Sequence, residues 1–154
     1  MGDQDCFIAA ALPIVRALCI KFEGVYLAPY LDPIGIATIA VGATYYEDGT
    51  RVTLRDPPVT RERAMQLLDW HLTQRYVPQT LALCPAIDTP GRLAALSDFA
   101  LNCGTGALRA STLRRRIAAG RWDDVPTELR RWTRGGGRVL RGLVLRREAE
   151  AALI

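Results

Sequence analysis

The stretch Lys21-Phe-Glu-Gly-Val-Tyr-Leu-Ala-Pro-Tyr-Leu-Asp-Pro-Ile-Gly-Ile-Ala-Thr-Ile-Ala-Val-Gly42 decides the fold, because the pattern changes within it from helical to β-rich. Glu23 stands directly before a glycine, which is the usual residue just past a helix C-terminus. Asp32 precedes a proline, a pair typical of turns, and Thr38 lies among β-branched residues that favour a strand. The stretch therefore predicts a helix that ends at Glu23 and leads into a β-hairpin.

The residues before it predict a helix over residues 6–23. Its apolar positions recur at steps of three and four, which is the pattern of one helix face. Asp5 is expected as the N-cap, and Pro13 requires either a kink or a later start near residue 12. The apolar run 6–20 is too short to span a bilayer. Acidic residues precede it, unlike the basic start of a signal peptide, so a buried first helix is expected.

Residues 25–58 predict a small β-rich lobe of two or three short antiparallel strands. Tyr, Val, Ile and Thr dominate there, and turn residues interrupt them. Asp48-Gly49 lies between two β-favouring pairs, which is a strong hairpin signal.

Residues 60–154 predict a mainly helical lobe with short connections. Helices are expected from Thr60 towards Leu83 with an end or bend at Pro78, from Pro90 to Gly104, from Thr112 to Ala119, from about Asp123 to Trp132, and from Gly142 onward. Gly135-Gly136-Gly137 is expected to break the chain. The fold class is therefore α+β, a small antiparallel hairpin lobe beside a helical lobe, in one domain over residues 1–154.

The positive charge is concentrated in the last third of the chain. The net charge is +4, yet residues 1–104 carry 8 Lys/Arg against 11 Asp/Glu, and residues 105–154 carry 12 Arg against 5 Asp/Glu. Charged residues on solvated helix faces explain this uneven charge distribution as well as a polyanionic partner does. Such a partner would be nucleic acid, an anionic membrane or an acidic cell wall.

Cysteine and histidine usage argues against a metal site. The four cysteines show no Cys-x-x-Cys spacing, and His71, expected at the surface or its boundary, is the single histidine. Free and mostly buried thiols are favoured over one or two disulfides. No metal or cofactor is expected.

The whole pattern resembles the phage-type lysozymes, or endolysins, which are glycosidases that cut peptidoglycan. That family carries a Glu at the end of its first helix, an Asp in the following hairpin and a Thr on the next strand, with the spacings of nine and six found here. Similar segments continue to the C-terminus in Leu96-Ser-Asp-Phe-Ala-Leu-Asn-Cys-Gly, in two Arg-Trp pairs and in the final Gly-Leu-Val-Leu-Arg-Arg-Glu-Ala-Glu. The resemblance runs from about Leu18 to the end and implies a lysozyme-like fold.

The resemblance also implies a reaction, the hydrolysis of the β-1,4 bond between N-acetylmuramic acid and N-acetylglucosamine. Glu23 would be the general acid and would have to hold a proton at the working pH, which partial burial or a nearby carboxylate favours. Asp32 would stay ionised and Thr38 would help to hold a water, an arrangement that favours inversion. Asn102 would bind an N-acetyl group, unless it is only a helix cap. Trp132 would stack on sugar, although a core position is favoured.

One departure from the family concerns the strand after Thr38. Ala40 stands at the first of two usual glycines and Ala43 at the usual His, which affects local packing more than catalysis. The partner implied is bacterial peptidoglycan, without nucleic acid or stable membrane insertion, and a monomer is expected. The enzyme would be made in the host cytoplasm and act in the periplasm, and the N-terminal segment would be a possible remnant of an export anchor.

Two rival interpretations remain. One is a catalytically inactive lysozyme-like protein whose Arg-rich C-terminal helices bind an anionic envelope or nucleic acid. The other is a lytic transglycosylase with the same glutamate, which the Asp and Thr pair argues against because hydrolysis needs a held water.

Overall fold

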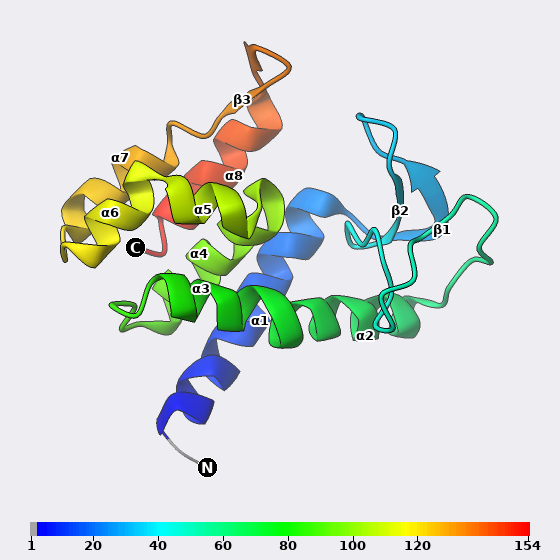
Figure 1. The fold of residues 1–154 in the computed structure, drawn as a ribbon, viewed down its shortest axis with the longest axis horizontal. Helices are drawn as coiled ribbons and strands as arrows, with labels where there is room; N and C mark the ends of the chain where they lie inside the picture. Colours follow the sequence, from blue (N-terminus) through cyan, green and yellow to red (C-terminus); the bar gives the residue numbers. More distant parts are fainter. Residues whose placement is uncertain (1–2) are drawn as a thin grey trace.

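Helix α1 (Asp3–Glu23) crosses the molecule and leads from the N-terminus to the β-rich lobe (Figure 1). The computed structural model describes residues 3–154, with side chains from Asp5 onward. The helix already includes Asp3, so the expectation that Asp5 is its N-cap is wrong. It also continues through Pro13, whose side is exposed to solvent, where the backbone carbonyl that loses its bond can be hydrated.

The β-rich lobe is built on one antiparallel pair, β1 (Tyr26–Leu31) and β2 (Ala37–Ala40). Thr38 lies opposite Tyr30, and the register shifts nearer the start of β1. A second, shorter hairpin follows, with one bridge between Tyr45 and Arg51 around the predicted Asp48-Gly49 turn. The prediction of short antiparallel strands is confirmed.

Helices α2 (Arg61–His71) and α3 (Val77–Leu83) form one helical segment with a π-helical turn, η1 (Leu72–Tyr76), between them. Thr60, where the sequence predicted a helix to begin, caps α2, because its hydroxyl accepts the N–H of Arg63. Pro78 lies in the first turn of α3, where its missing N–H is tolerated after the wider π turn. The proline therefore does not end the helical segment.

The helical lobe surrounds α4 (Pro90–Cys103), in which every residue from Leu93 to Ala100 is buried. The remaining elements are α5 (Thr105–Ala110), α6 (Thr112–Ala118), the 3-10 turn η2 (Trp122–Asp124), α7 (Val125–Leu129), the hairpin strands β3 (Arg134–Gly135) and β4 (Arg138–Val139), and α8 (Arg141–Ala151). Thr89 and Ser111 cap α4 and α6, since their side chains accept the N–H groups of Arg92 and Arg114. Helix α5 was not predicted, and the glycine run, expected to interrupt the helices, forms the turn of the β3–β4 hairpin.

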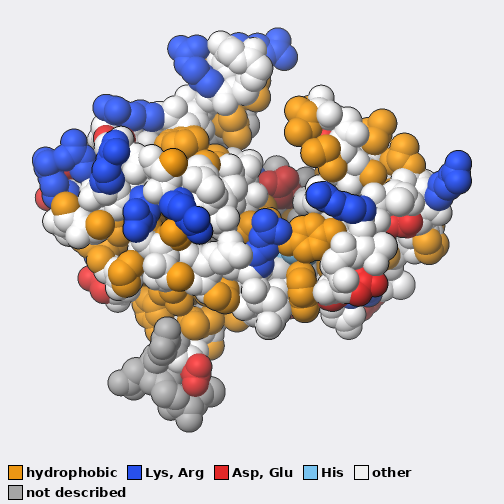
Figure 2. Space-filling model, in the orientation of Figure 1, with side chains coloured by type: hydrophobic (Ala, Val, Ile, Leu, Met, Phe, Trp, Pro, Cys, Tyr) orange, Lys and Arg blue, Asp and Glu red, His pale blue; other side chains and the backbone are white. Residues whose placement is uncertain are grey.

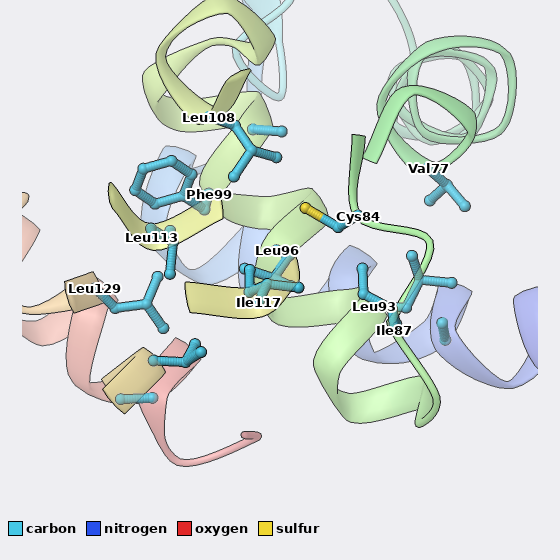
Figure 3. Close-up of a cluster of buried hydrophobic side chains, with 14 residues drawn as sticks. Val77, Cys84, Ile87, Leu93, Leu96, Phe99, Leu108, Leu113, Ile117 and Leu129 are labelled. Carbon is cyan, nitrogen blue, oxygen red and sulfur yellow. The ribbon is translucent and has the colours of Figure 1, made fainter. Parts of the chain in front are cut away.

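The main core surrounds α4 and takes side chains from α1 and α3 as well as from the helices that follow it. Figure 3 shows Leu96, Phe99, Leu113, Ile117 and Leu129 gathered there from α4, α6 and α7. Two smaller clusters join α1 to α4 and β2 to α2. All four cysteines are free thiols, and two of them are buried.

Arginine side chains gather on one face of the helical lobe and on the β3–β4 hairpin (Figure 2). Across the described residues, none of the helices combines the length and the apolar character that a membrane span requires.

Candidate active site

The Glu23 carboxylate lies where α1 ends, between that helix and the chain leaving β2. Gly24 takes a φ of +76°, a conformation that turns the chain out of the helix at once. Gly42 lies directly against the glutamate, since a Cβ at that position would stand 3.3 Å from Glu23 Oε2. The side chain keeps 23% of its surface exposed. Gly42 therefore packs against one side of the Glu23 carboxylate, and another side of the carboxylate remains exposed to solvent.

A buried arginine from α8 holds the same carboxylate. Arg146 Nη1 lies 2.5 Å from Glu23 Oε1. Its Nε and Nη2 donate to the two oxygens of Asp98 in α4, each over 2.8 Å. Arg146 is 3% exposed and Asp98 is fully buried. Burial by itself would raise the pKa of Asp98, but the Arg146 hydrogen bonds and charge outweigh it and the pKa is lowered.

A second buried cluster adjoins the first on α8. Arg147 Nη2 donates to Glu150 Oε1 over 2.7 Å and to Asn102 Oδ1 over 3.0 Å. Arg147 and Glu150 are fully buried. Burial, followed by the contact with Asp98, raises the pKa of Glu150 to about 9. The Arg147 contact holds the Asn102 amide oxygen, and Asn102 lies within α4, whose C-cap is Gly104.

The two other predicted catalytic residues have partners within the β1–β2 turn. Asp32 Oδ1 accepts the N–H groups of Ile34 and Ile36 over 3.0 and 2.8 Å, so this carboxylate orders the turn. Thr38 is buried, and its hydroxyl donates to the carbonyl of Ile36 over 3.0 Å. The hydroxyl oxygen still has lone pairs that can accept a hydrogen bond from a water molecule.

Three adjoining hollows form one groove across the face that carries Glu23. Glu23 and Arg146 line the middle one, of about 460 Å³, together with Asn102 and Leu143. The latter two continue into a hollow of about 400 Å³ that Trp132 also lines. In the other direction the groove passes between the Pro33–Ile34 turn and the β3–β4 hairpin in a hollow of about 500 Å³. Figure 2 shows this end as a notch between hairpin and β-rich lobe.

Trp132 lies partly in the core and partly in the groove, the two positions considered for it from the sequence. Its ring meets Phe99 edge to face, with centroids 5.1 Å apart, so one side belongs to the core. The residue also lines the groove. The structure thus brings Glu23, Asn102 and Trp132 to one groove, and places Asp32 next to it through Pro33.

His71 was expected at the surface or its boundary, but it packs in the interior near Ala43. The histidine is buried, and its Nε2 lies 3.0 Å from the carbonyl oxygen of Tyr45, so a surface position was wrong. Burial lowers its pKa below 6.5. Ala43 and His71 line one cavity of about 30 Å³, beside Gly42. An imidazole therefore reaches this region from α2. Ala40 adopts a φ of +57°, a conformation that favours glycine.

Sequence reasoning did not single out Arg146, Asp98, Arg147 or Glu150 as parts of the site. The available signals were an acid inside the apolar run of α4 and two adjacent arginines on the final helix. Over the described part of the chain, no three His, Cys, Asp or Glu side chains gather in a way that would hold a metal ion.

Comparison with known proteins supplies the family. The family model for phage lysozyme matches residues 20–150. The SAR-endolysin of Escherichia phage Mu is 31% identical over 91% of this chain and 78% of its own length. The endolysin from Escherichia coli O157:H7 phage FAHEc1 superposes with a TM-score of 0.81 at 26% identity, over 91% of this chain and 89% of that one.

A further solved structure is the muramidase domain of SpmX from Asticaccaulis excentricus. It gives a TM-score of 0.75 at 29% identity, over 90% of this chain and 92% of that one. The α+β architecture with its small hairpin lobe is that of these lysozyme structures, as the sequence predicted. With the family match extending from the end of α1 to the end of α8, the chain belongs to the phage lysozyme family.

Proposed function

We propose that the chain is an endolysin that hydrolyses the β-1,4 bond between N-acetylmuramic acid and N-acetylglucosamine in bacterial peptidoglycan. The observation that carries this proposal is the Glu23 carboxylate, which lies in the middle of a groove and is held by Arg146 and Gly42. A half-buried carboxyl group beside an open groove suits proton transfer to a bound sugar.

Glu23 acts as the general acid and protonates the glycosidic oxygen as the bond to it breaks. Asp32 acts from the neighbouring turn, where two backbone N–H groups bond to one of its oxygens. It polarises the attacking water or offsets the positive charge that develops on the sugar. Thr38 accepts a hydrogen bond from that water, which attacks opposite the leaving group and inverts the anomeric centre.

The remaining predicted residues bind the glycan along the groove. The Asn102 amide, fixed by Arg147, bonds an N-acetyl group. The Trp132 ring stacks on a sugar through the face that does not meet Phe99. The relatives named endolysin and muramidase support this assignment of substrate. We further propose that the chain acts as a monomer on the cell wall in the periplasm.

Replacing Glu23 by Gln tests the proposal, because the amide keeps the shape of the side chain but cannot donate its proton as an acid. Purified Gram-negative cells stripped of their outer membrane are mixed with each protein, and the fall in turbidity is followed. We expect wild type to clear the cells and Glu23→Gln to lose at least about a hundredfold in rate. Clearing by the variant at the wild-type rate would overturn the assignment.

Glu47→Gln is the matched control. Glu47 is also half-buried, with 30% of its side chain exposed, and it also meets an arginine, Arg63, at 2.5 Å, but it lies away from the groove. We expect this variant to clear cells as wild type does. If neither wild type nor the control clears cells, the arginines of the helical lobe become the functional surface and the chain a binding protein with a lysozyme fold.

A further inference from the structure

Five ionisable side chains form one contact network behind the groove. Glu23 meets Arg146 at 2.5 Å, and Arg146 meets Asp98 at 2.8 Å. Arg147 meets Glu150 at 2.7 Å, and Glu150 lies against Asp98, which joins the two halves. The network draws on α1, α4 and α8, and all of it except Glu23 is buried. The groove therefore touches this network at Glu23.

With all five groups ionised, the network carries one net negative charge, which a single bound proton removes. Asp98 is ionised, because both of its oxygens accept N–H groups of Arg146 and the Cys19 thiol donates to it over 3.4 Å. Glu150 Oε2 is buried and accepts a hydrogen bond from none of the described donors. A proton on that atom can be donated to Asp98. The raised pKa of Glu150 agrees with this placement.

Arg146 poses a difficulty for acid catalysis. A guanidinium in contact with Glu23 favours the ionised carboxylate, whereas the general acid must begin each cycle protonated. Asp98 lies on the opposite side of the same guanidinium and carries the opposite charge. Its negative charge opposes the effect of Arg146 on Glu23 and leaves the hydrogen bond that orients the glutamate in place.

Several other groups that face this region carry no charge at neutral pH. Three such groups are Tyr30 from β1, Tyr76 from η1 and Cys19 from α1. Burial raises the pKa of each, and the negative charge of Glu23 raises it further. Cys103 adjoins Arg147, and burial raises its pKa as well. Asp32, on the β1–β2 turn beside the groove, adds a carboxylate that acts on Tyr30 together with Glu23. Arg146, Arg147, Asp98 and Asp32 are thus charged groups that bear on Glu23 or Glu150 within the described structure.

We propose that Asp98 is a positioning residue for the reaction: it offsets the charge of Arg146 so that Glu23 can hold its catalytic proton, and a neutral Glu150 anchors Asp98 by donating a hydrogen bond to it. The proposal rests on the proposed function, since it presupposes Glu23 as the acid. It gives the two buried acids different roles. The charge of Asp98 matters for catalysis, whereas Glu150 contributes as a neutral donor.

The pH–activity profile separates these roles. Clearing rates of wild type, Asp98→Asn and Glu150→Gln are measured across pH on one batch of cells, so that effects of the substrate cancel. For Asp98→Asn we expect the basic limb, where activity is lost as the acid gives up its proton, to move at least about one pH unit lower. For Glu150→Gln we expect that limb to stay in place, because the amide is neutral and still donates.

A uniform loss of activity in Asp98→Asn, with the basic limb unmoved, would show that Asp98 is only structural and overturn the proposal. A shift of the limb in Glu150→Gln as large as in Asp98→Asn would show that Glu150 is ionised and would overturn its role. If Glu23→Gln retains activity, the proposed function fails first. Inactive Glu23→Gln with an unmoved limb in Asp98→Asn defeats this inference alone.

A titration of the wild-type protein keeps the test independent of whether Asp98→Asn folds. Carboxyl carbons are observed by NMR, and Glu150→Gln identifies the Glu150 signal by its disappearance. We expect this signal to remain that of a protonated acid at pH 7. A Glu150 signal that is already ionised at pH 6 would overturn the proposal.

Discussion

Gly42→Ala is the most informative single change in the site, because two separate costs can be assigned to it. The residue has a φ of +70°, so any L side chain there is strained. That strain amounts to about 1–2 kcal/mol. In addition, the new Cβ would lie 3.3 Å from Glu23 Oε2, 3.4 Å from Cδ and 3.5 Å from Cγ. The carboxylate would have to move by a few tenths of an ångström.

Gly49→Ala provides the matched control. This glycine has a φ of +85° and nothing within 4 Å of an added Cβ, so it carries the backbone cost without the contact. In a chain of this length, about 1 kcal/mol corresponds to about 2–4 °C in Tm. We therefore expect both variants to melt about 2–8 °C below wild type.

The two variants should differ in activity. Clearing is measured well below both melting temperatures, so that both proteins are folded. We expect Gly49→Ala to act as wild type does, and Gly42→Ala to lose about threefold to tenfold, since small displacements of a reacting group are costly. Equal activity of the two variants would refute the claim that Gly42 positions the Glu23 carboxylate.

Three further predictions concern stability. Phe99→Ala should cost about 3–5 kcal/mol in urea unfolding, because this fully buried ring supports both Leu96 and Trp132, and a loss below about 1 kcal/mol would contradict the described core. The pKa of His71 is lowered by burial, so the unfolded chain binds its proton first as pH falls below 6.5. Stability should decline there, and should decline less in His71→Gln. The Arg63 hydrogen bonds lower the pKa of Glu47 to about 2, so Glu47→Gln should cost about 0.5–1 kcal/mol at neutral pH. That cost should shrink as pH falls from 4.5 through about 2, and a cost that stays constant over this range would contradict the ion pair.

Local signals explain which elements could be predicted from the sequence. Thr60, Thr89 and Ser111 each cap a helix by accepting a backbone N–H three residues ahead, and this depends on a few neighbouring residues. The turn at Asp48-Gly49 is local in the same way. Helix α5 was missed because its glycine is a poor helix former, and its packing on neighbouring helices compensates for that. Local chemistry thus fixes where elements begin but not every element that packing supports.

The residues of the site likewise fall into those that a sequence pattern identifies and those that only tertiary packing brings together. Glu23, Asn102 and Trp132 were found by their resemblance to a family pattern, and the structure gathers them in one groove. Asp98 and Arg146 lie 48 residues apart in the chain, and their pairing depends on how α4 and α8 pack. An isolated sequence contains no local signal for such a pair. For the same reason His71 was wrongly placed at the surface, since its burial depends on the approach of Tyr45.

The most direct test of the central claim is the mass of the products that the protein releases from purified peptidoglycan. Hydrolysis by way of Glu23 predicts muropeptides that end in a reducing N-acetylmuramic acid with one water added, and none from Glu23→Gln. Products lighter by one water would mean a lytic transglycosylase. Fragments ending in N-acetylglucosamine, or hydrated products from Glu23→Gln as well, would contradict the proposed bond or the proposed acid.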